Sequence, residues 1–151
     1  VCDFANDNAD GQVVLSGSRA AVQRAVEIAQ DKGAKRAKML AVSAPFHCKL
    51  MLPAADVMRK SLATVEMVEP VVPVIANANA TPVSDVMEIR RLLVEQVTAR
   101  VRWRESVLAM RDAGVDHIVV DISSFFPPTT FSSFPHHVLN FHSLIILHTC
   151  L

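Results

Sequence analysis

The pattern of apolar and polar positions along the chain predicts an α/β protein. Short apolar runs bounded by turn-forming residues predict strands at 1–5, 12–16, 34–42, 70–76 and 115–120. Residues 6–11, between the first two runs, are rich in turn formers, so we expect a β-hairpin there. Later strands alternate with helices, which favours a mostly parallel sheet in that part of the fold.

Apolar residues at helical spacing predict four helices. Ser18 is the expected cap of the first, whose buried face would carry Val22, Ala25, Val26 and Ala29 and whose end falls at Gly33. Further helices are expected with Pro53 in the first turn, after a Ser84 cap, and from Trp103 to Gly114.

Gln96 shares the apolar stripe of Ile89 and Leu93 on the helix predicted after Ser84. Two interpretations are open. Gln96 is either buried, in which case its amide needs a polar partner, or it is a partly exposed residue at the stripe edge.

Composition narrows the possible functions. The 151 residues are 51% hydrophobic and 20% charged, as in a globular domain. Fifteen basic and fifteen acidic side chains balance, which offers no support for binding to nucleic acid or to an anionic membrane. The scattered cysteines Cys2, Cys48 and Cys150 favour a reducing compartment. The chain opens without Met on an apolar run, so we expect a preceding part to be missing.

The last thirty residues differ from the rest, because no Asp, Glu, Lys or Arg follows Asp121. Phenylalanines and histidines gather there instead, beside Pro127 and Pro128. We interpret 121–151 as a divergent tail read from an altered frame or a different exon. A histidine-rich metal-binding tail is the alternative, although its histidines lack regular ligand spacing.

The segment SAPFHCKL, residues 43–50, lies at a predicted strand-to-helix junction and places His47 beside Cys48. A metal site or a thiol–imidazole pair is disfavoured, because adjacent side chains on an extended segment point to opposite faces. Cys48 is therefore expected to be a small buried residue. His47 is either a general base, because functional side chains often lie at such strand-to-helix junctions, or a hydrogen-bonded structural histidine. No G-x-S-x-G nucleophile motif occurs in the chain; the nearest match surrounds Gly17 and Ser18.

Four stretches in series, 5–17, 33–55, 70–83 and 92–107, resemble the C-terminal half of malonyl-CoA:acyl-carrier-protein transacylases. The resemblance runs from about Val1 to Val120. It implies an α/β-hydrolase-like acyltransferase large subdomain and a ferredoxin-like small subdomain. In this chain it implies a truncated small subdomain at 1–42 and the C-terminal part of the large subdomain at 43–120. Beyond residue 120 the chain departs from the family's pattern.

The same resemblance implies roles for individual residues. His47 matches the base that activates the family's serine, and Gln96 matches the glutamine that orients this histidine by a hydrogen bond. Phe46 matches a position that favours malonyl over methylmalonyl groups. The remaining substrate-binding positions implied are Asn6, Asn8 and Gln12 in the cleft-facing turn, and Lys35 and Arg36 near the entrance for coenzyme A and carrier protein. For Lys35 and Arg36 a solvated basic strand end is the open alternative.

By resemblance, then, the parent protein transfers malonyl groups in fatty-acid biosynthesis, with malonyl-CoA as substrate, acyl carrier protein as partner and no further cofactor or metal. It would be a monomer when complete, cytoplasmic in a bacterium, and in the mitochondrial matrix or plastid of a eukaryote. The family's serine and its malonate-binding arginine would lie upstream of Val1. The alternative hypothesis is a non-catalytic fragment that binds carrier protein or coenzyme A.

Overall fold

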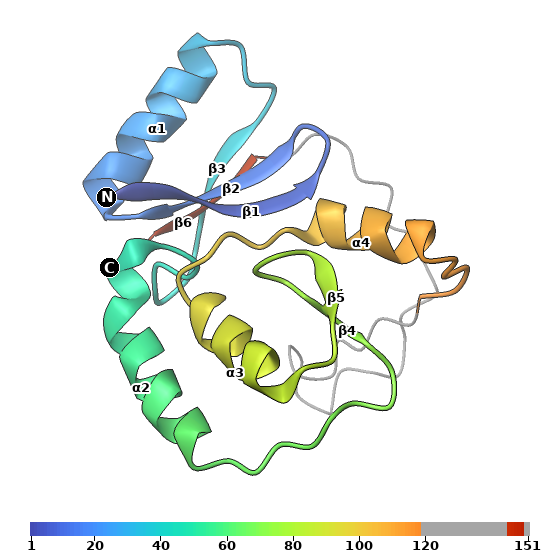
Figure 1. Cartoon of the computed structure of the whole chain (residues 1–151). Coiled ribbons are helices and arrows are strands. Elements are labelled where there is room, and N and C mark those ends of the chain that lie inside the picture. Colours follow the sequence, from blue (N-terminus) through green and yellow to red (C-terminus); the bar gives the residue numbers. More distant parts are fainter. Residues whose placement is uncertain (119–144, 150–151) are drawn as a thin grey trace, which may run out of the picture.

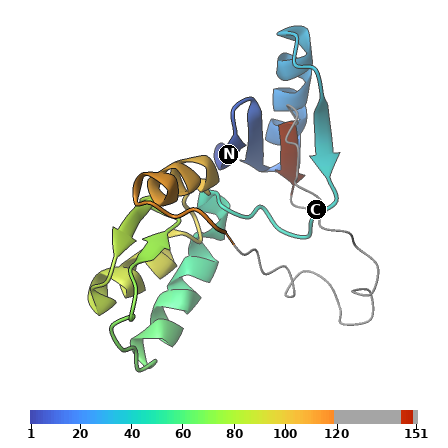
Figure 2. The same ribbon diagram turned by 90° about the vertical axis from the view of Figure 1, so that its right-hand side faces the viewer.

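The computed structural model describes residues 1–118 and 145–149. These residues form two groups of elements, seen apart in Figure 2: a four-stranded sheet with one helix, and a second group of three helices around a two-stranded sheet. The α/β class predicted from the sequence is confirmed. The four-stranded sheet has one antiparallel and two parallel pairs, whereas the later two-stranded sheet is antiparallel rather than parallel as predicted for that part of the fold.

The chain opens with the predicted hairpin (Figure 1). Strand β1, Cys2–Ala9, pairs antiparallel with β2, Gln12–Gly17. The predicted turn at 6–11 is shorter than expected: it narrows to Asp10 and Gly11, where Gly11 has a φ of 74°. The polar run that suggested a turn therefore continues β1.

Helix α1, Arg19–Asp31, follows the hairpin as predicted, with Ser18 in extended conformation at its N-cap. Gly33 has a φ of 84° just beyond the end of the helix, a conformation that glycine adopts readily. Val22 and Val26 are buried and pack with Leu15, Ala37 and Met39 to form the core of this group. Ala25 and Ala29, predicted on the same face, are half-buried.

The first sheet has the strand order β1-β2-β6-β3. Strand β3, Ala37–Leu40, ends the β-β-α-β unit, and β6, Ile145–Thr149, lies between β2 and β3 and runs parallel to both. The sequence pattern did not predict β6. The rest of the predicted 121–151 tail, including His136, His137 and His142, lies outside the described residues.

The second group begins with a short 3-10 helix η1, Lys49–Met51, and helix α2, Leu52–Ala63, with Pro53 in the first turn as predicted. Strands β4, Val74–Ala76, and β5, Thr81–Val83, form an antiparallel pair. Helices α3, Val86–Glu95, and α4, Trp103–Asp112, complete the group. Within the described residues no helix has the length and apolar character needed to cross a membrane.

Three predictions for this second group were wrong in detail. The helix N-cap is Asp85 rather than Ser84, since its carboxylate accepts a hydrogen bond from the Glu88 amide at 2.7 Å. Strand β5, which begins at Thr81, was not among the predicted strands. Residues 115–118 form no strand, and the remaining two residues of that predicted strand lie outside the described part.

The two groups meet where β1 passes the loop between α3 and α4. The amide of Val101 donates to the carbonyl of Ala5 at 2.7 Å, and the amide of Asp7 donates to the carbonyl of Val101 at 2.8 Å. Together they form a short bridge across the two groups. This bridge fixes the position of the loop that follows α3, on which the candidate site depends.

Candidate active site

His47 lies in a turn with a left-handed backbone. Its φ is 58°, and residues 43–48 form bends and a turn rather than the extended segment assumed from the sequence. The argument that His47 and Cys48 must point to opposite faces therefore does not apply. A positive φ outside glycine costs free energy and persists where surrounding contacts impose it, often at functional sites.

Two main-chain carbonyls impose the orientation of the imidazole. Nδ1 of His47 lies 3.0 Å from the oxygen of Gln96 and 3.2 Å from the oxygen of Ala99. A carbonyl oxygen only accepts hydrogen bonds, so Nδ1 carries the proton and donates it. In the neutral ring Nε2 then keeps its lone pair. The geometry leaves His47 in the tautomer that a general base requires.

Gln96 meets His47 as predicted, but through its main chain rather than its side-chain amide. It occupies the C-cap of α3 and is half-buried, which agrees with the interpretation of a residue at the stripe edge. Carbonyls in the last turn of a helix lack intrahelical donors. The end of α3 therefore offers His47 an acceptor that no sequence motif encodes.

Other contacts hold the turn against β1 and within itself. The amide of Lys49 donates to Oδ2 of Asp3 at 3.0 Å, which ties the turn to β1. Cys48 is fully buried and its thiol donates to the carbonyl of Pro45 at 3.1 Å, which confirms the prediction that Cys48 packs inside. Phe46, directly before the histidine, is 40% exposed.

The loop after α3, which supplies the two carbonyls that contact His47, is also fixed by the β4–β5 turn. The amide of Arg102 donates to Oδ1 of Asn77 at 3.1 Å, and its guanidinium donates to the carbonyl of Asn79 at 3.3 Å. The loop after α3 is thus fixed between the β4–β5 turn and β1. Asp3, Asn77 and Arg102 were missed by sequence reasoning, because only the folded chain brings them to this loop.

The predicted substrate residues of the hairpin lie on β1 and β2. Asn6 and Asn8 are half-buried in β1, and Asn6 bridges to Val101, two residues after the carbonyl of Ala99. Gln12 is 6% exposed at the start of β2. Oδ1 of Asn6 and Oε1 of Gln12 are buried and have no hydrogen-bond donor among the residues that the structure describes. Both side chains retain the capacity to accept a hydrogen bond.

Lys35 and Arg36 are exposed in the loop that precedes β3, whereas the His47 turn follows β3. These two parts of the predicted site therefore lie beyond opposite ends of one strand. Figure 1 shows the loop before β3 at the top of the sheet, away from the start of α2. The structure gives neither basic residue a contact with the His47 turn.

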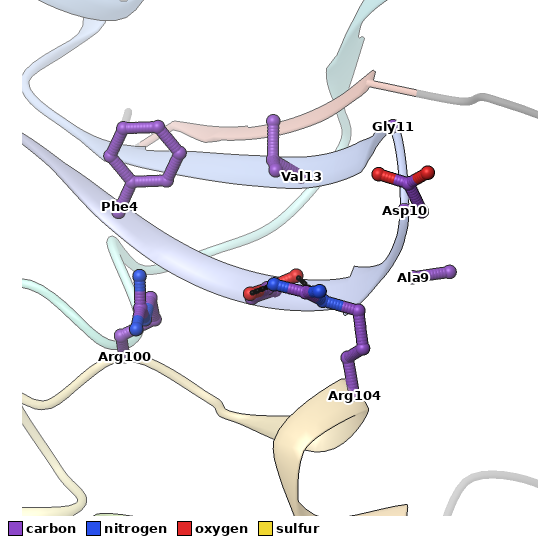
Figure 3. Close-up of a pocket in the computed structure, with 8 residues that line it drawn as sticks. Phe4, Ala9, Asp10, Gly11, Val13, Arg100 and Arg104 are labelled. Atoms are coloured by element: carbon purple, nitrogen blue, oxygen red, sulfur yellow. Dashed lines mark hydrogen bonds and ion pairs between the residues drawn. The ribbon is translucent and has the colours of Figure 1, made fainter. Parts of the chain in front are cut away.

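A pocket of about 170 Å³ opens beside the hairpin (Figure 3). Arg104 of α4 reaches towards β1 there, and its Nε and a terminal nitrogen donate to the two carboxylate oxygens of Asp7 at 3.1 and 3.0 Å. These hydrogen bonds hold the pKa of Asp7 below its ordinary value, against the opposing effect of burial. Asp7 lies in the predicted turn, but sequence reasoning did not identify its ion pair with Arg104.

Within residues 1–118 and 145–149, no three His, Cys, Asp or Glu side chains gather into a group that could hold a metal ion. The chemistry available at the described site is that of an imidazole held as a proton acceptor. A histidine held in this way, on a mixed α/β fold, is suited to general base catalysis.

Comparison with known proteins shows which enzymes the chain is similar to. The chain is 42% identical over 115 residues to the malonyl CoA-acyl carrier protein transacylase of Haemophilus influenzae, which covers 76% of this chain and 37% of the relative. No protein-family model matches the chain. The chain thus spans little more than a third of the length of the curated relatives it matches.

Solved structures give the same result. The crystal structure of the acyl-carrier-protein S-malonyltransferase of Bartonella henselae matches with a TM-score of 0.74 and 53% identity, over 77% of this chain and 37% of that one. A type II PKS acyl-carrier protein in complex with its malonyl-transacylase matches with a TM-score of 0.74 and 41% identity, over 76% and 37%. The resemblance predicted from the sequence is confirmed: about three quarters of this chain is related to a part of malonyl CoA-acyl carrier protein transacylases.

Proposed function

We propose that this chain is part of an enzyme of fatty-acid biosynthesis that moves a malonyl group from coenzyme A to the phosphopantetheine thiol of acyl carrier protein. The observation that carries the proposal is the orientation of His47. Its Nδ1–H is held by the carbonyls of Gln96 and Ala99, so Nε2 is available as a base. The similarity to malonyl CoA-acyl carrier protein transacylases supplies the substrate class.

In this proposal Nε2 accepts the hydroxyl proton of a serine as the serine oxygen attacks the malonyl thioester carbonyl. The carbon–sulfur bond then breaks, and the sulfur of coenzyme A leaves with the proton returned by the imidazolium. In the second half, Nε2 accepts the proton of the phosphopantetheine thiol while its sulfur attacks the serine ester. The serine oxygen leaves and regains that proton. In this proposal the serine would lie in the part of the complete enzyme that precedes Val1.

The two carbonyls take the role that a carboxylate has in a Ser-His-Asp triad. When Nε2 accepts a proton, the imidazolium becomes positive, and the negative ends of two carbonyl dipoles stabilise that charge at Nδ1. Neutral carbonyls do so less strongly than a carboxylate. We therefore assign Gln96 a positioning role that acts through its main chain.

Further assignments follow the same proposal. Phe46 would restrict the space beside the malonyl α-carbon, and the acceptors on Asn6 and Gln12, with Asn8, would face the acyl chain or the coenzyme. Lys35 and Arg36, which are exposed, would attract the phosphates of coenzyme A or the acidic surface of a carrier protein. The complete protein would act as a monomer, in the cytoplasm of a bacterium or in the mitochondrial matrix or plastid of a eukaryote.

The finer architecture belongs to the proposal as well. Residues 1–42 would be a ferredoxin-like small subdomain without its first strand and helix, because β1, β2, α1 and β3 have the order of its second half. Strand β6 lies between β2 and β3, where that first strand would lie, but runs parallel to both. Residues 43–120 would be the C-terminal part of an α/β-hydrolase-like large subdomain.

The test is a fusion enzyme. The portion of the Haemophilus influenzae transacylase that precedes the matching part is joined to Val1, and malonyl transfer to acyl carrier protein is followed by mass spectrometry. We expect transfer, and a fall in kcat of about 10²–10⁴-fold for His47→Ala. A folded fusion that transfers nothing, or that works equally well without His47, would overturn the proposal.

The same fusion protein also tests the alternative hypothesis of a non-catalytic fragment. Saturable binding of acyl carrier protein or coenzyme A, weakened by a paired Lys35→Ala and Arg36→Ala variant but without any transfer, would replace the enzyme proposal with the binding one.

A further inference from the structure

One carboxylate of β1 holds the turn that carries the candidate base. Oδ2 of Asp3 accepts a hydrogen bond from the amide of Lys49 at 3.0 Å, two residues after His47. Lys49 is the first residue of η1, and the first amides of a helix have no acceptor within the helix. The side chain of Cys48, at the N-cap, makes no capping hydrogen bond. Asp3 therefore supplies this cap from another element and fixes the turn.

A second carboxylate of the same strand holds the loop that carries the two carbonyls. Asp7 is buried, and Arg104 in the first turn of α4 donates to both of its carboxylate oxygens, at 3.1 and 3.0 Å. The amide of Asp7 donates to the carbonyl of Val101 at 2.8 Å, two residues after Ala99. Asp7 thus contacts the loop through its main chain and the helix after the loop through its side chain.

A β-bulge directs the two carboxylates to opposite faces of the hairpin. Asp3 and Asp7 are four residues apart, and side chains at that spacing share a face in a regular strand. Asp3 lies opposite Ser16 of β2; the register then shifts, and Asp7 lies opposite Val13. Positions 13 and 16 point to opposite faces of β2, so the shift turns Asp7 away from the face of Asp3. In Figure 1 the strand passes from the start of α2 to the start of α4.

We propose that Asp3 and Asp7 are positioning residues for His47. Because one strand joins them, they set together the distance between Nδ1 of the imidazole and its two carbonyl acceptors. Asp3 anchors the donor side of this contact and Asp7 anchors the acceptor side, so the loss of either anchor lets the two sides move apart. This inference rests on the proposed function, in which the contact keeps Nε2 available as a base.

The donor side is tested by two substitutions of Asp3. Asp3→Ala removes the acceptor for the Lys49 amide, whereas Asp3→Asn keeps an oxygen in its place. In the fusion enzyme Asp3→Ala should lower kcat by about three- to tenfold and leave KM within about twofold, because the base is displaced but the substrate contacts remain. Asp3→Asn should restore most of kcat. In ¹⁵N NMR spectra of the chain alone, the Nδ1–H tautomer of His47 should lose its dominance in Asp3→Ala and keep it in Asp3→Asn.

The acceptor side is tested at Arg104. Arg104→Gln removes the paired donors to Asp7 and should produce the same fall in kcat and the same loss of the Nδ1–H signal of His47. Arg104→Lys keeps the charge and should recover part of both. Arg111→Gln is the matched control, because Arg111 lies on the same helix but its ion pair with Asp112 is exposed. It should leave kcat within about twofold and the tautomer unchanged.

The two anchors act on one contact, so their losses should not add. The double variant Asp3→Ala/Arg104→Gln should lower kcat by less than the product of the two single effects. Single effects that multiply in full would show that each residue acts only on its own part of the fold, and would overturn the joint role. A fall in kcat while the tautomer of His47 stays unchanged would reflect a general loss of stability and would also overturn it.

The tautomer separates this inference from the proposed function, since it is measured without any transfer of malonyl groups. A folded fusion that transfers nothing, together with an Nδ1–H signal that depends on Asp3 and Arg104, would refute the enzyme and support the two anchors. Transfer by the fusion with kcat and tautomer unchanged in both single variants would leave the enzyme and refute the anchors.

Discussion

Nδ1 of His47 lies 3.0 Å from the main-chain oxygen of Gln96, forty-nine residues further along the chain. The contact depends on where α3 ends rather than on the side chain at its C-cap. We therefore predict that Gln96→Ala in the fusion enzyme lowers kcat by less than about threefold, since the carbonyl remains in place. Gln96→Pro removes the amide that donates to Leu92 at 2.9 Å, and should lower kcat by at least about tenfold.

The imidazole nitrogen shifts in ¹⁵N NMR spectra check the cause of this difference. In the unaltered chain and in Gln96→Ala, His47 should show the Nδ1–H tautomer. In Gln96→Pro that tautomer should lose its dominance. A Gln96→Ala enzyme as inactive as His47→Ala would show instead that the side-chain amide is the working group.

The left-handed backbone of His47 predicts an unusual order of stability among its variants. Asn adopts a positive φ readily, so His47→Asn should lose only the imidazole hydrogen bonds, about 1 kcal/mol. Val is β-branched, and His47→Val should cost about 1–2 kcal/mol more. Urea unfolding of the three proteins checks this. Equal stability of the two variants would mean that residue 47 is not left-handed in solution.

Gly17 is the position where an added methyl group should do most damage. A Cβ there would lie 2.1 Å from the carbonyl oxygen of Val1 and 2.9 Å from the Cα of Cys2, and both are main-chain atoms. We predict that Gly17→Ala lowers the free energy of unfolding by about 3 kcal/mol because the start of β1 must move. Gly33→Ala is the comparison, since its added methyl would meet open space and only the φ of 84° would be strained. Chemical denaturation should show the larger loss for Gly17.

Local signals in the sequence were sufficient for the hairpin, for the start of α1 after Ser18 and for the glycine after α1, because each depends on residues within a few positions of one another. The Ser18 side chain itself makes no capping hydrogen bond. The geometry of His47 could not be predicted in this way. Its backbone and tautomer depend on Asp3, Gln96 and Ala99, which lie more than forty residues away. The sequence pointed to the histidine as a candidate base. Every residue has a main-chain carbonyl, however, so the sequence could not show which carbonyls orient the imidazole.

Residues 70–76 show the opposite case. Their apolar run predicts burial, but Val71, Val72 and Val74 are exposed in the part of the chain that the structure describes. Periodicity reports the environment in which a segment evolved, and a strand apolar on both faces anticipates neighbours on both sides. Strand β5 was missed for a different reason. Asn77, Asn79 and Pro82 are turn formers, so the local pattern around them favours a turn and does not predict a strand.

Thiol reactivity should separate the two described cysteines. Cys48 is fully buried, whereas Cys2 is exposed. In a Cys150→Ser background one thiol should therefore react with a disulfide reagent in the native chain and two after unfolding. Partial burial, and the charge of Asp3 to a lesser degree, raise the pKa of the Cys2 thiol, so its reaction should be slow at pH 7 and accelerate at higher pH. Two fast thiols in the native state would contradict the packing of Cys48 against Pro45.

The ion pair between Asp7 and Arg104 predicts how stability changes in acid. Hydrogen bonds from Arg104 hold the pKa of Asp7 below its ordinary value of 3.8. A carboxyl whose folded pKa is depressed contributes stability above the unfolded pKa, and that contribution is lost as the pH falls through the folded pKa. Asp7→Asn should therefore lower the urea midpoint at pH 6–7 and lose less stability than the unaltered chain between about pH 4 and pH 2.

Asp112→Asn is the control for this prediction, because Asp112 and its partner Arg111 are 66% and 69% exposed and such a pair contributes little. Its unfolding curves should follow those of the unaltered chain at every pH. Glu105 also has a lowered pKa, owing to Arg102, so the measured quantity is the difference between variants rather than the whole acid transition. Since Asp7 joins β1 to α4 across the two groups of elements, its loss should also weaken the Nδ1–H signal of His47, an effect that Asp112→Asn should not produce.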